Sequence, residues 1–280
     1  MSAVRLAGGG DRQAKPATAA RMYDYFLGGT HNFPADREAA DAIVAMFPAT
    51  LLAARVNRAF LRRTVNYLCE MGISQFLDIG SGIPTEGNVH EIAQAANPRA
   101  RVVYVDIDPV AVAESQEMLE GNDLAIAIRG DARYPRQIIA HPQVRKLLDF
   151  EQPVAVLLVA VLHFVGDDDE VKSLVRQLVD AVPKGSYLVA SHVIDESSPD
   201  FERIEDVKRV HDVYKRQTST ALRMRTRAEL GEFFEGWELV DPGIVWVWEW
   251  KPTPGEPPPV TVDAHYHIKG GIAGGVARIT

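Results

Sequence analysis

Acidic residues stand at the ends of three short apolar runs in the sequence. Asp78 lies in "LDIGSG", just before Gly80 and Gly82. Asp106 ends "RVVYVD", and Asp131 ends "LAIAIRGD". Glycines let a backbone approach a ligand closely, and an acid 24 residues beyond Gly82 can accept hydrogen bonds from both hydroxyls of a ribose. Asp131 can accept one from an exocyclic amine such as that of adenine, so the spacing predicts a nucleoside site.

The glycine turn does not match the G-x-G-x-x-G pattern of dinucleotide sites. That pattern needs a third glycine where the chain has Thr85, and Pro84 interrupts the phosphate-facing turn. Asp78 would repel a pyrophosphate but can hold a cationic amino acid group, so we expect a nucleoside without phosphates. Asp108 precedes a proline and is expected to cap a helix. The backbone amide of Ala132 is expected to add a contact to the base.

Short apolar runs alternate with helical stretches after residue 72, and these elements must position the acids. Such alternation predicts an α/β, Rossmann-like, mostly parallel seven-stranded sheet with helices on both faces. Its ligands bind beyond the carboxyl ends of the strands, where the three acids stand. The expected strands are 74–80, 101–108, 124–131, 153–165, 185–193, 243–250 and 265–279, and the expected helices are 36–47, 51–68, 86–96, 109–120, 171–182, 199–216 and 226–235.

These motifs resemble those of the class I S-adenosylmethionine-dependent methyltransferases. "LDIGSGIP" resembles their first motif, "VDID" their acidic ribose motif and "GDAR" their adenine motif. The segments "PATAARMYDYFLGGTHNFPADREAAD" and "RTRAELGEFFEGWELVDPGIV" resemble a largely uncharacterised actinobacterial methyltransferase family. The resemblance implies S-adenosyl-L-methionine as cofactor and S-adenosyl-L-homocysteine as product. It assigns cofactor binding to Tyr23, Asp78, Gly80, Ser81, Gly82, Asp106, Ile107, Asp108, Gly130, Asp131 and Ala132.

His163 is the candidate catalytic residue. It lies in "VLHFVGDDDE", which resembles the "LHDW…D" segment of small-molecule O-methyltransferases, in which the histidine deprotonates the acceptor; Val165 stands at the tryptophan position. The alternative is a histidine that packs or lines the cofactor site. The acids at 167–169 are expected to cap the next helix. We expect no metal, because no other ligands flank these acids at suitable spacing.

The stretch "YDYFLGGTHNFPAD" (23–36) precedes the first strand, so the sheet does not need it. We expect residues 1–15 to be a disordered tail, 16–70 to form a helical lid over the cofactor cleft, and 71–280 to form the methyltransferase domain. Gly28 and Gly29 would provide a hinge or a close backbone approach. The alternative is a packed helix followed by a loop. The residues expected to wall the cleft or contact the substrate are Arg21, Tyr23, Tyr25, Phe26, His31, Asn32 and Phe33.

The composition limits which binding partners and which cellular location we expect. A net charge of −8 argues against a nucleic-acid groove as the main surface. No apolar run is long enough for a signal peptide or a membrane span, so we expect a cytoplasmic chain that binds no membrane. The apolar context of Cys69, the single cysteine, favours a buried thiol.

Three functions remain to be weighed. The first is methyl transfer to a small molecule, with oxygen as one target. The second is a nucleoside-binding module without catalysis, in which S-adenosylmethionine is a structural or sensing ligand. The third, a nicotinamide-dependent oxidoreductase, conflicts with the missing third glycine. The sequence names neither the acceptor nor the oligomeric state.

Overall fold

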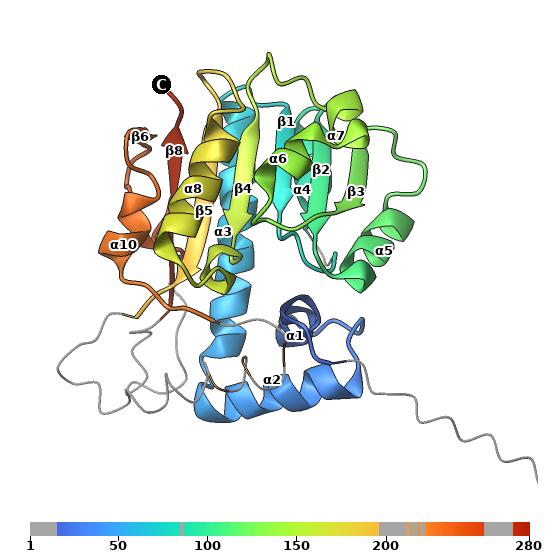
Figure 1. Cartoon of the computed structure of the whole chain (residues 1–280), viewed down its shortest axis with the longest axis vertical. Coiled ribbons are helices and arrows are strands. Elements are labelled where there is room, and N and C mark those ends of the chain that lie inside the picture. Colours follow the sequence, from blue (N-terminus) through green and yellow to red (C-terminus); the bar gives the residue numbers. More distant parts are fainter. Residues whose placement is uncertain are drawn as a thin grey trace, which may run out of the picture.

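A twisted sheet occupies the middle of the protein (Figure 1). The structure is a computed structural model that describes residues 16–84, 87–195, 212, 215, 218, 222–254 and 271–280. The strands run in the order β3-β2-β1-β4-β5-β8-β6, and β7 pairs with β8. Neighbours from β3 to β5 are parallel, whereas β8 runs antiparallel to its partners. The strands are β1 (Gln75–Ile79), β2 (Arg101–Asp106), β3 (Ala125–Arg129), β4 (Ala155–Val159), β5 (Tyr187–Val193), β6 (Glu238–Leu239), β7 (Val245–Trp246) and β8 (Ile272–Arg278).

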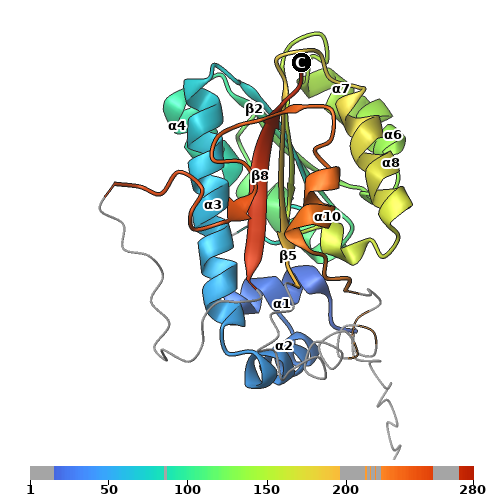
Figure 2. The same cartoon turned by 90° about the vertical axis from the view of Figure 1, so that its left-hand side faces the viewer.

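Helices cover both faces of the sheet, which confirms the expected fold. Figure 2 shows α3 and α4 on one face and α6, α7, α8 and α10 on the other. The helices on both faces bury the central strands: every residue of β1 and the first four residues of β4 are buried. The helices are α1 (Ala19–Phe26), α2 (Pro34–Met46), α3 (Thr50–Glu70), α4 (Val89–Ala96), α5 (Pro109–Met118), α6 (Pro135–Ala140), α7 (Pro142–Leu147), η1 (Leu162–Phe164, a 3₁₀ turn), α8 (Asp168–Val179) and α10 (Arg227–Glu232).

The N-terminal helices lie at one end of the sheet. α1 and α2 lie beyond the carboxyl ends of the parallel strands, and α3 runs from there along one face of the sheet (Figures 1 and 2). α2 and α3 meet at 103°. In the part of the chain that the structure describes, no single helix is long and apolar enough to cross a membrane. The bent pair α2 and α3 meets that criterion only when the two are taken together.

Several expected elements are shorter than the sequence suggested. The apolar run 153–165 is a strand only to Val159; the chain then turns into η1. The expected strand 243–250 contains only the two-residue β7, and β6 is an additional short strand before it. The expected helix 199–216 and tail 1–15 lie outside the described ranges, apart from single residues in the former.

Side-chain caps fix several helix starts. Asp108 caps α5 by accepting from the amide of Val110 at 2.8 Å, as expected. Asp36 does not begin its helix; it lies three residues inside the cap position and accepts from the amide of Phe33 at 2.8 Å. This difference arises because a proline after Phe33 already supplies the first helical turn.

Candidate active site

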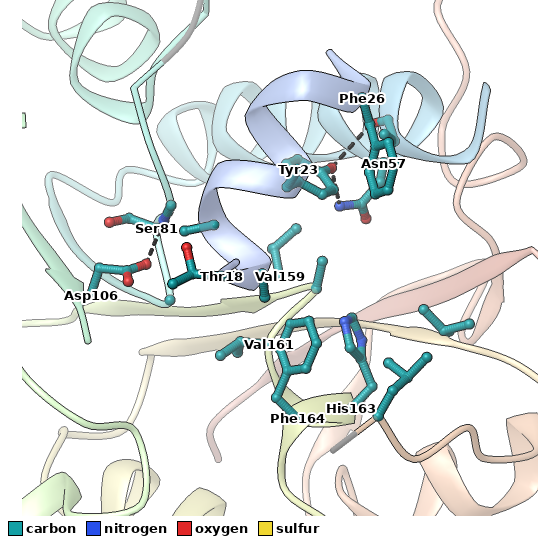
Figure 3. Close-up of a pocket in the computed structure, with 18 of the residues that line it drawn as sticks. Thr18, Tyr23, Phe26, Asn57, Ser81, Asp106, Val159, Val161, His163 and Phe164 are labelled. Carbon is teal, nitrogen blue, oxygen red and sulfur yellow. Dashed lines mark hydrogen bonds between the residues drawn. The ribbon is translucent and has the colours of Figure 1, made fainter. Parts of the chain in front are cut away.

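A cavity of about 840 Å³ lies between the carboxyl ends of the parallel strands and the N-terminal helices. Every residue that the sequence assigned to the cofactor lines it, as does His163. Figure 3 shows Asp106 and Ser81 on one side of this space and His163 and Phe164 on another. Apolar side chains make up much of the remaining wall, and we call them the apolar lining: Phe26, Ile43, Phe47, Leu61, Val159, Val161, Phe164, Val193, Ile194, Leu222, Met224 and Ile272.

Asp106 organises the glycine turn. Its Oδ2 accepts from the amide of Gly82 at 2.7 Å, and its Oδ1 accepts from the amide of Asp108 at 2.8 Å. Gly80 and Gly82 have φ values of +75° and +68°, which residues with a Cβ rarely adopt. Each carboxylate oxygen keeps a second lone pair for a ligand. Burial raises the pKa of Asp106 to about 6, against the lowering effect of the Asp108 and Gly82 amides.

Asp78 is a second buried carboxyl group in the cavity wall. Burial raises its pKa to about 7; Arg58 lowers this pKa and Asp106 adds to the rise. Arg58 also lines the cavity, and its buried Nε has no hydrogen-bond partner among the residues described. A cation beside Asp78 would lower the raised pKa and stabilise the ionised form. This fits the expected contact with a cationic amino acid group.

Asp131, the third acid, already forms hydrogen bonds within the protein. Both oxygens of Asp131 accept from Arg133, with the shortest contact at 2.5 Å. Partial burial raises the pKa of Asp131, but the hydrogen bonds from Arg133 outweigh it and hold the pKa below its usual value. A ligand amine would therefore share this carboxylate with Arg133. Ile107 lines the same side and is 53% exposed, so it offers an apolar surface to a planar ring.

Buried ion pairs tie helix α1 to α2 and to the loop that follows β2. Arg21 Nε lies 2.9 Å from Asp36 Oδ2, and its Nη1 lies 3.3 Å from Asp108 Oδ2. Thr18 Oγ1 donates to the same Asp108 oxygen at 2.5 Å. Arg21 lines the cavity, but its guanidinium already pairs with the carboxylates of Asp36 and Asp108. Asp108 is both a helix cap and the anchor of α1.

A directed chain of hydrogen bonds joins α1, α3 and the sheet. Tyr23 donates its hydroxyl hydrogen to the carbonyl of Ala54 at 3.1 Å and accepts from Asn57 Nδ2 at 3.0 Å (Figure 3). Asn57 Oδ1 accepts from Ser191 Oγ at 2.7 Å, and that hydroxyl accepts from the amide of Ala160 at 3.0 Å. Ala160 has a φ of +56°, a strained value at the end of β4.

Four residues expected to contact substrate do not line the cavity. The hydroxyl of Tyr25 donates to Asp41 at 2.8 Å, and His31 pairs with Glu114 at 3.3 Å. Asn32 is buried against α1, where it donates to Asp24. Phe33 is exposed, and Arg21 lies over its ring. The expectation for Tyr25, His31, Asn32 and Phe33 therefore gains no support. Of the residues expected to wall the cleft or contact the substrate, Arg21, Tyr23 and Phe26 line the cavity.

The two glycines of this stretch have different roles. Gly28 has a φ of +84°, and a Cβ at this position would meet no atom of the described residues within 4 Å. A Cβ at Gly29 would meet the Asp24 carboxylate, so Gly29 permits the close backbone approach that the sequence suggested.

His163 projects from η1 into the cavity (Figure 3). The residue is 5% exposed, and its Nδ1 has no hydrogen-bond partner in the described ranges. Burial holds the pKa of His163 well below its usual value, with further lowering by His192 and Arg225. The ring packs edge-to-face against Phe164 and His192, with centroids 4.3 and 5.4 Å away. A neutral imidazole with a free nitrogen can accept a proton.

The acids at 167–169 have two separate roles. Asp167 caps α8 by accepting from the amide of Glu170 at 2.8 Å, as expected. Asp168 instead pairs with Arg223 at 2.5 Å and Arg225 at 2.8 Å. No group of three or more metal-ligating side chains comes together within the described ranges.

The sequence did not single out Asn57, Ser191, His192 or Arg225 as parts of the site. Arg225 opens the quoted segment "RTRAELGEFF", which was the one available signal for it.

The residues around the cavity fit S-adenosylmethionine. The glycine turn leaves no Cβ to fill the space beside Asp106, and both Asp106 oxygens keep a lone pair. Such a turn, at the carboxyl ends of parallel strands in the order β3-β2-β1-β4-β5 with the antiparallel β8 beside β5, agrees with the class I S-adenosylmethionine-dependent methyltransferases that the motifs resemble.

Comparisons with known proteins identify the family. Residues 11–280 match the S-adenosyl methyltransferase family, and the chain belongs to it. A DUF574-family protein of Streptomyces avermitilis is 41% identical, with a TM-score of 0.85 over 95% of this chain and 98% of its own. A Thermobifida fusca protein provisionally named a methyltransferase is 37% identical, with a TM-score of 0.85 over 96% of this chain and 97% of its own. No curated protein matches the sequence.

The chain is therefore an S-adenosylmethionine-dependent methyltransferase that acts on a methyl acceptor. This membership gives no support to the alternative of a module without catalysis. The separate contacts assigned to Asp78, Asp106, Asp131 and Ala132 stay predictions.

Proposed function

We propose that this methyltransferase transfers the methyl group to a hydroxyl oxygen of an uncharged small molecule, with His163 as general base. The observation that carries the proposal is the place of His163 in the cavity wall, where burial holds its pKa well below the usual value. The imidazole is therefore neutral and keeps one nitrogen lone pair. An acceptor hydroxyl in the cavity that donates to this lone pair could give up its proton there.

The surroundings of His163 favour an apolar acceptor. Phe26, Phe164 and Met224 belong to the apolar lining of the cavity. A charged acceptor would lose its hydration there without compensation from these side chains. A phenol suits such a site, because its ring is apolar and its hydroxyl supplies the proton.

The bound cofactor supplies an electrophilic methyl group attached to a sulfonium. The glycine turn, Asp106 and Asp78 would hold the nucleoside and amino acid portions. Holding the acceptor oxygen in line with the methyl carbon supplies much of the acceleration. The His163 imidazole would take the acceptor proton as the oxygen forms its new bond to carbon, and would later release that proton to water. Its lowered pKa keeps the imidazole unprotonated at neutral pH, although it also makes the base weaker.

The test is turnover of defined hydroxyl acceptors. The purified chain is incubated with S-adenosylmethionine and a panel of substituted phenols, and mass spectrometry measures S-adenosylhomocysteine and methyl ether. For any phenol that is methylated, His163→Ala should reduce kcat about 100-fold or more, the usual contribution of a general base. The dissociation constant of S-adenosylmethionine should change little.

Phe164→Leu is the matched control, because it alters the neighbouring ring without removing a base. Full activity of His163→Ala would reduce His163 to a packing residue. Methylation of amines but of no phenol would exclude the oxygen target.

A further inference from the structure

Two arginines from one segment clamp the turn that carries His163. The segment 222–226 lies about 60 residues beyond η1 in the sequence, and the backbone amide of Arg223 donates to the carbonyl of His163 at 2.8 Å. Arg225 is 1% exposed. Its Nη1 donates to the carbonyl of Leu162 at 3.2 Å, and its Nη2 donates to that of Val165 at 2.9 Å. One guanidinium therefore holds the backbone on both sides of His163.

The same guanidinium fixes the state of a second histidine. Arg225 Nη1 lies 2.9 Å from His192 Nε2, and His192 Nδ1 lies 2.6 Å from the carbonyl of Val193. Arginine only donates, so Nε2 must present its lone pair; a carbonyl only accepts, so Nδ1 must carry the hydrogen. These contacts permit one neutral tautomer of His192. A proton on Nε2 would face the N–H of Arg225.

Among the residues that the structure describes, few charges surround Arg225 and His192. Asp168 Oδ1 accepts from Arg225 Nε at 2.8 Å and is the counter-charge in contact with it. Arg223 and Glu229 act on His192 from farther away, and Phe233 lies 5.2 Å from the centre of the Arg225 guanidinium. Burial lowers the pKa of His192 to about 4, and the positive charge of Arg225 contributes to this lowering.

The neutral His192 ring supports His163. The two rings meet edge-to-face at 87° with centroids 5.4 Å apart. A second cation at this distance would oppose protonation of His163 in addition to the charge of Arg225. The edge-to-face contact also limits rotation of the His163 ring.

We propose that Arg225 is a positioning residue for methyl transfer: it fixes the turn that carries His163 and locks His192 in the Nδ1–H tautomer against which His163 rests. The expected effect of Arg225 on catalysis rests on the proposed role of His163 as base. The expected effect of Arg225 on the turn and on the His192 tautomer does not. No bond is made or broken at Arg225, which acts only through its contacts with η1 and His192.

Histidine side-chain NMR tests the structural part in the full chain. Long-range ¹H–¹⁵N spectra from pH 5 to pH 8 should show His192 as the neutral Nδ1–H tautomer throughout, with the signal assigned by a His192→Gln variant. Arg225→Lys keeps the charge but loses the forked geometry. In this variant the His192 signal should become a mixture of tautomers, and the His163 signal should shift. Arg176→Gln is the control, since the Arg176 side chain lies over the ring of Trp237 in the last turn of α8; it should leave the His192 tautomer unchanged.

Kinetics with a methylated phenol tests the catalytic part. Arg225→Lys should lower kcat at least 10-fold while the dissociation constant of S-adenosylmethionine changes less than about twofold. If Arg225→Lys does not fold, Asp168→Ala removes the counter-charge from the more exposed end of the clamp. It should then disturb the His192 signal and lower kcat at least threefold.

The outcomes separate the two proposals. A wild-type His192 that titrates between pH 5 and pH 8, or that carries its proton on Nε2, overturns the Arg225 proposal. Unchanged spectra and kcat in Arg225→Lys, or in Asp168→Ala where that variant replaces it, also overturn it. Full activity of His163→Ala, or no phenol methylated, refutes the base and leaves the spectra to decide the role of Arg225 in fixing the turn.

Discussion

Asp106→Ala is the variant that tests cofactor binding most directly. The carboxylate accepts from the amides of Gly82 and Asp108 at 2.7 and 2.8 Å. Each oxygen keeps one lone pair, so the group can accept from two ribose hydroxyls while it holds the turn. The variant removes both acceptors and both backbone contacts. It should therefore weaken the binding of S-adenosylmethionine and loosen the glycine turn together.

The magnitude follows from the number of hydrogen bonds lost. A hydrogen bond to a charged group contributes about 1.5 kcal/mol at the lower end of its range. Two such bonds amount to about 3 kcal/mol, which is roughly a 150-fold larger dissociation constant. Asp106→Asn keeps one acceptor oxygen and should lose about half of this free energy, or about a 10-fold weaker affinity.

Titration calorimetry with S-adenosylmethionine at pH 8 measures both variants. Burial raises the pKa of Asp106 to about 6, so its carboxylate is ionised at pH 8 and protonated increasingly below pH 6. Wild-type affinity should fall as the pH is lowered from 8 to 5.5, and Asp106→Ala should show a smaller fall. Asp123→Ala, at an exposed position outside the cavity lining, is the control. An unchanged dissociation constant in a folded Asp106→Ala protein would refute the ribose role.

Three further variants test the site. Gly80→Ala places a Cβ 2.4 Å from a methyl carbon of Val161 at a φ of +75°, whereas a Cβ at Gly82, with a φ of +68°, meets no atom of the described residues within 4 Å. In urea unfolding Gly82→Ala should cost roughly 1–2 kcal/mol of strain and Gly80→Ala clearly more, and equal losses would contradict the close packing. Arg21→Met leaves two buried carboxylates without their guanidinium and should cost about 3–5 kcal/mol in the same assay; a loss below about 1 kcal/mol would show that the ion pairs do not anchor α1. Burial raises the pKa of Asp78 from 3.8 to about 7, so the free-energy cost of ionising it in the folded protein is absent below pH 4 and complete above pH 7. Asp78→Asn should therefore stabilise the cofactor-free protein by on the order of 2–4 kcal/mol at pH 8 and not at pH 4. Equal stability of the variant and the wild type at pH 8 would contradict this cost.

The cofactor half of the site could be read from the sequence because its parts are local. Asp78, Gly80 and Gly82 lie within five residues, and the other acids follow strands whose apolar runs are plain. Parallel strands bring their carboxyl ends to one edge of the sheet, so residues that follow successive strands in the sequence lie close together in the structure. Capping by Asp108 and Asp167 was also predictable, since a cap depends on residues two or three positions away.

For the N-terminal stretch, residues 23–36, the sequence did not predict which side chains face the cavity. Its composition indicated a packed, aromatic segment but not which side chains face inward. Tyr23 and Phe26 turn to the cavity, while Tyr25 turns to Asp41 and Asn32 to Asp24. That choice depends on the angle at which α1 packs against α2 and α3, which tertiary packing sets.

The surroundings of His163 were decided by the tertiary structure alone. The motif placed His163 after the fourth strand, but Arg225 and His192 reach it from distant segments. Nothing local in the sequence pairs Asp168 with Arg225. A buried guanidinium takes its partners from whatever backbone carbonyls and carboxylates the fold brings within hydrogen-bond distance, because it must satisfy its donors there. The sequence by itself thus determined the fold class and the cofactor edge of the sheet, and tertiary contacts decided which histidine is free and what holds it.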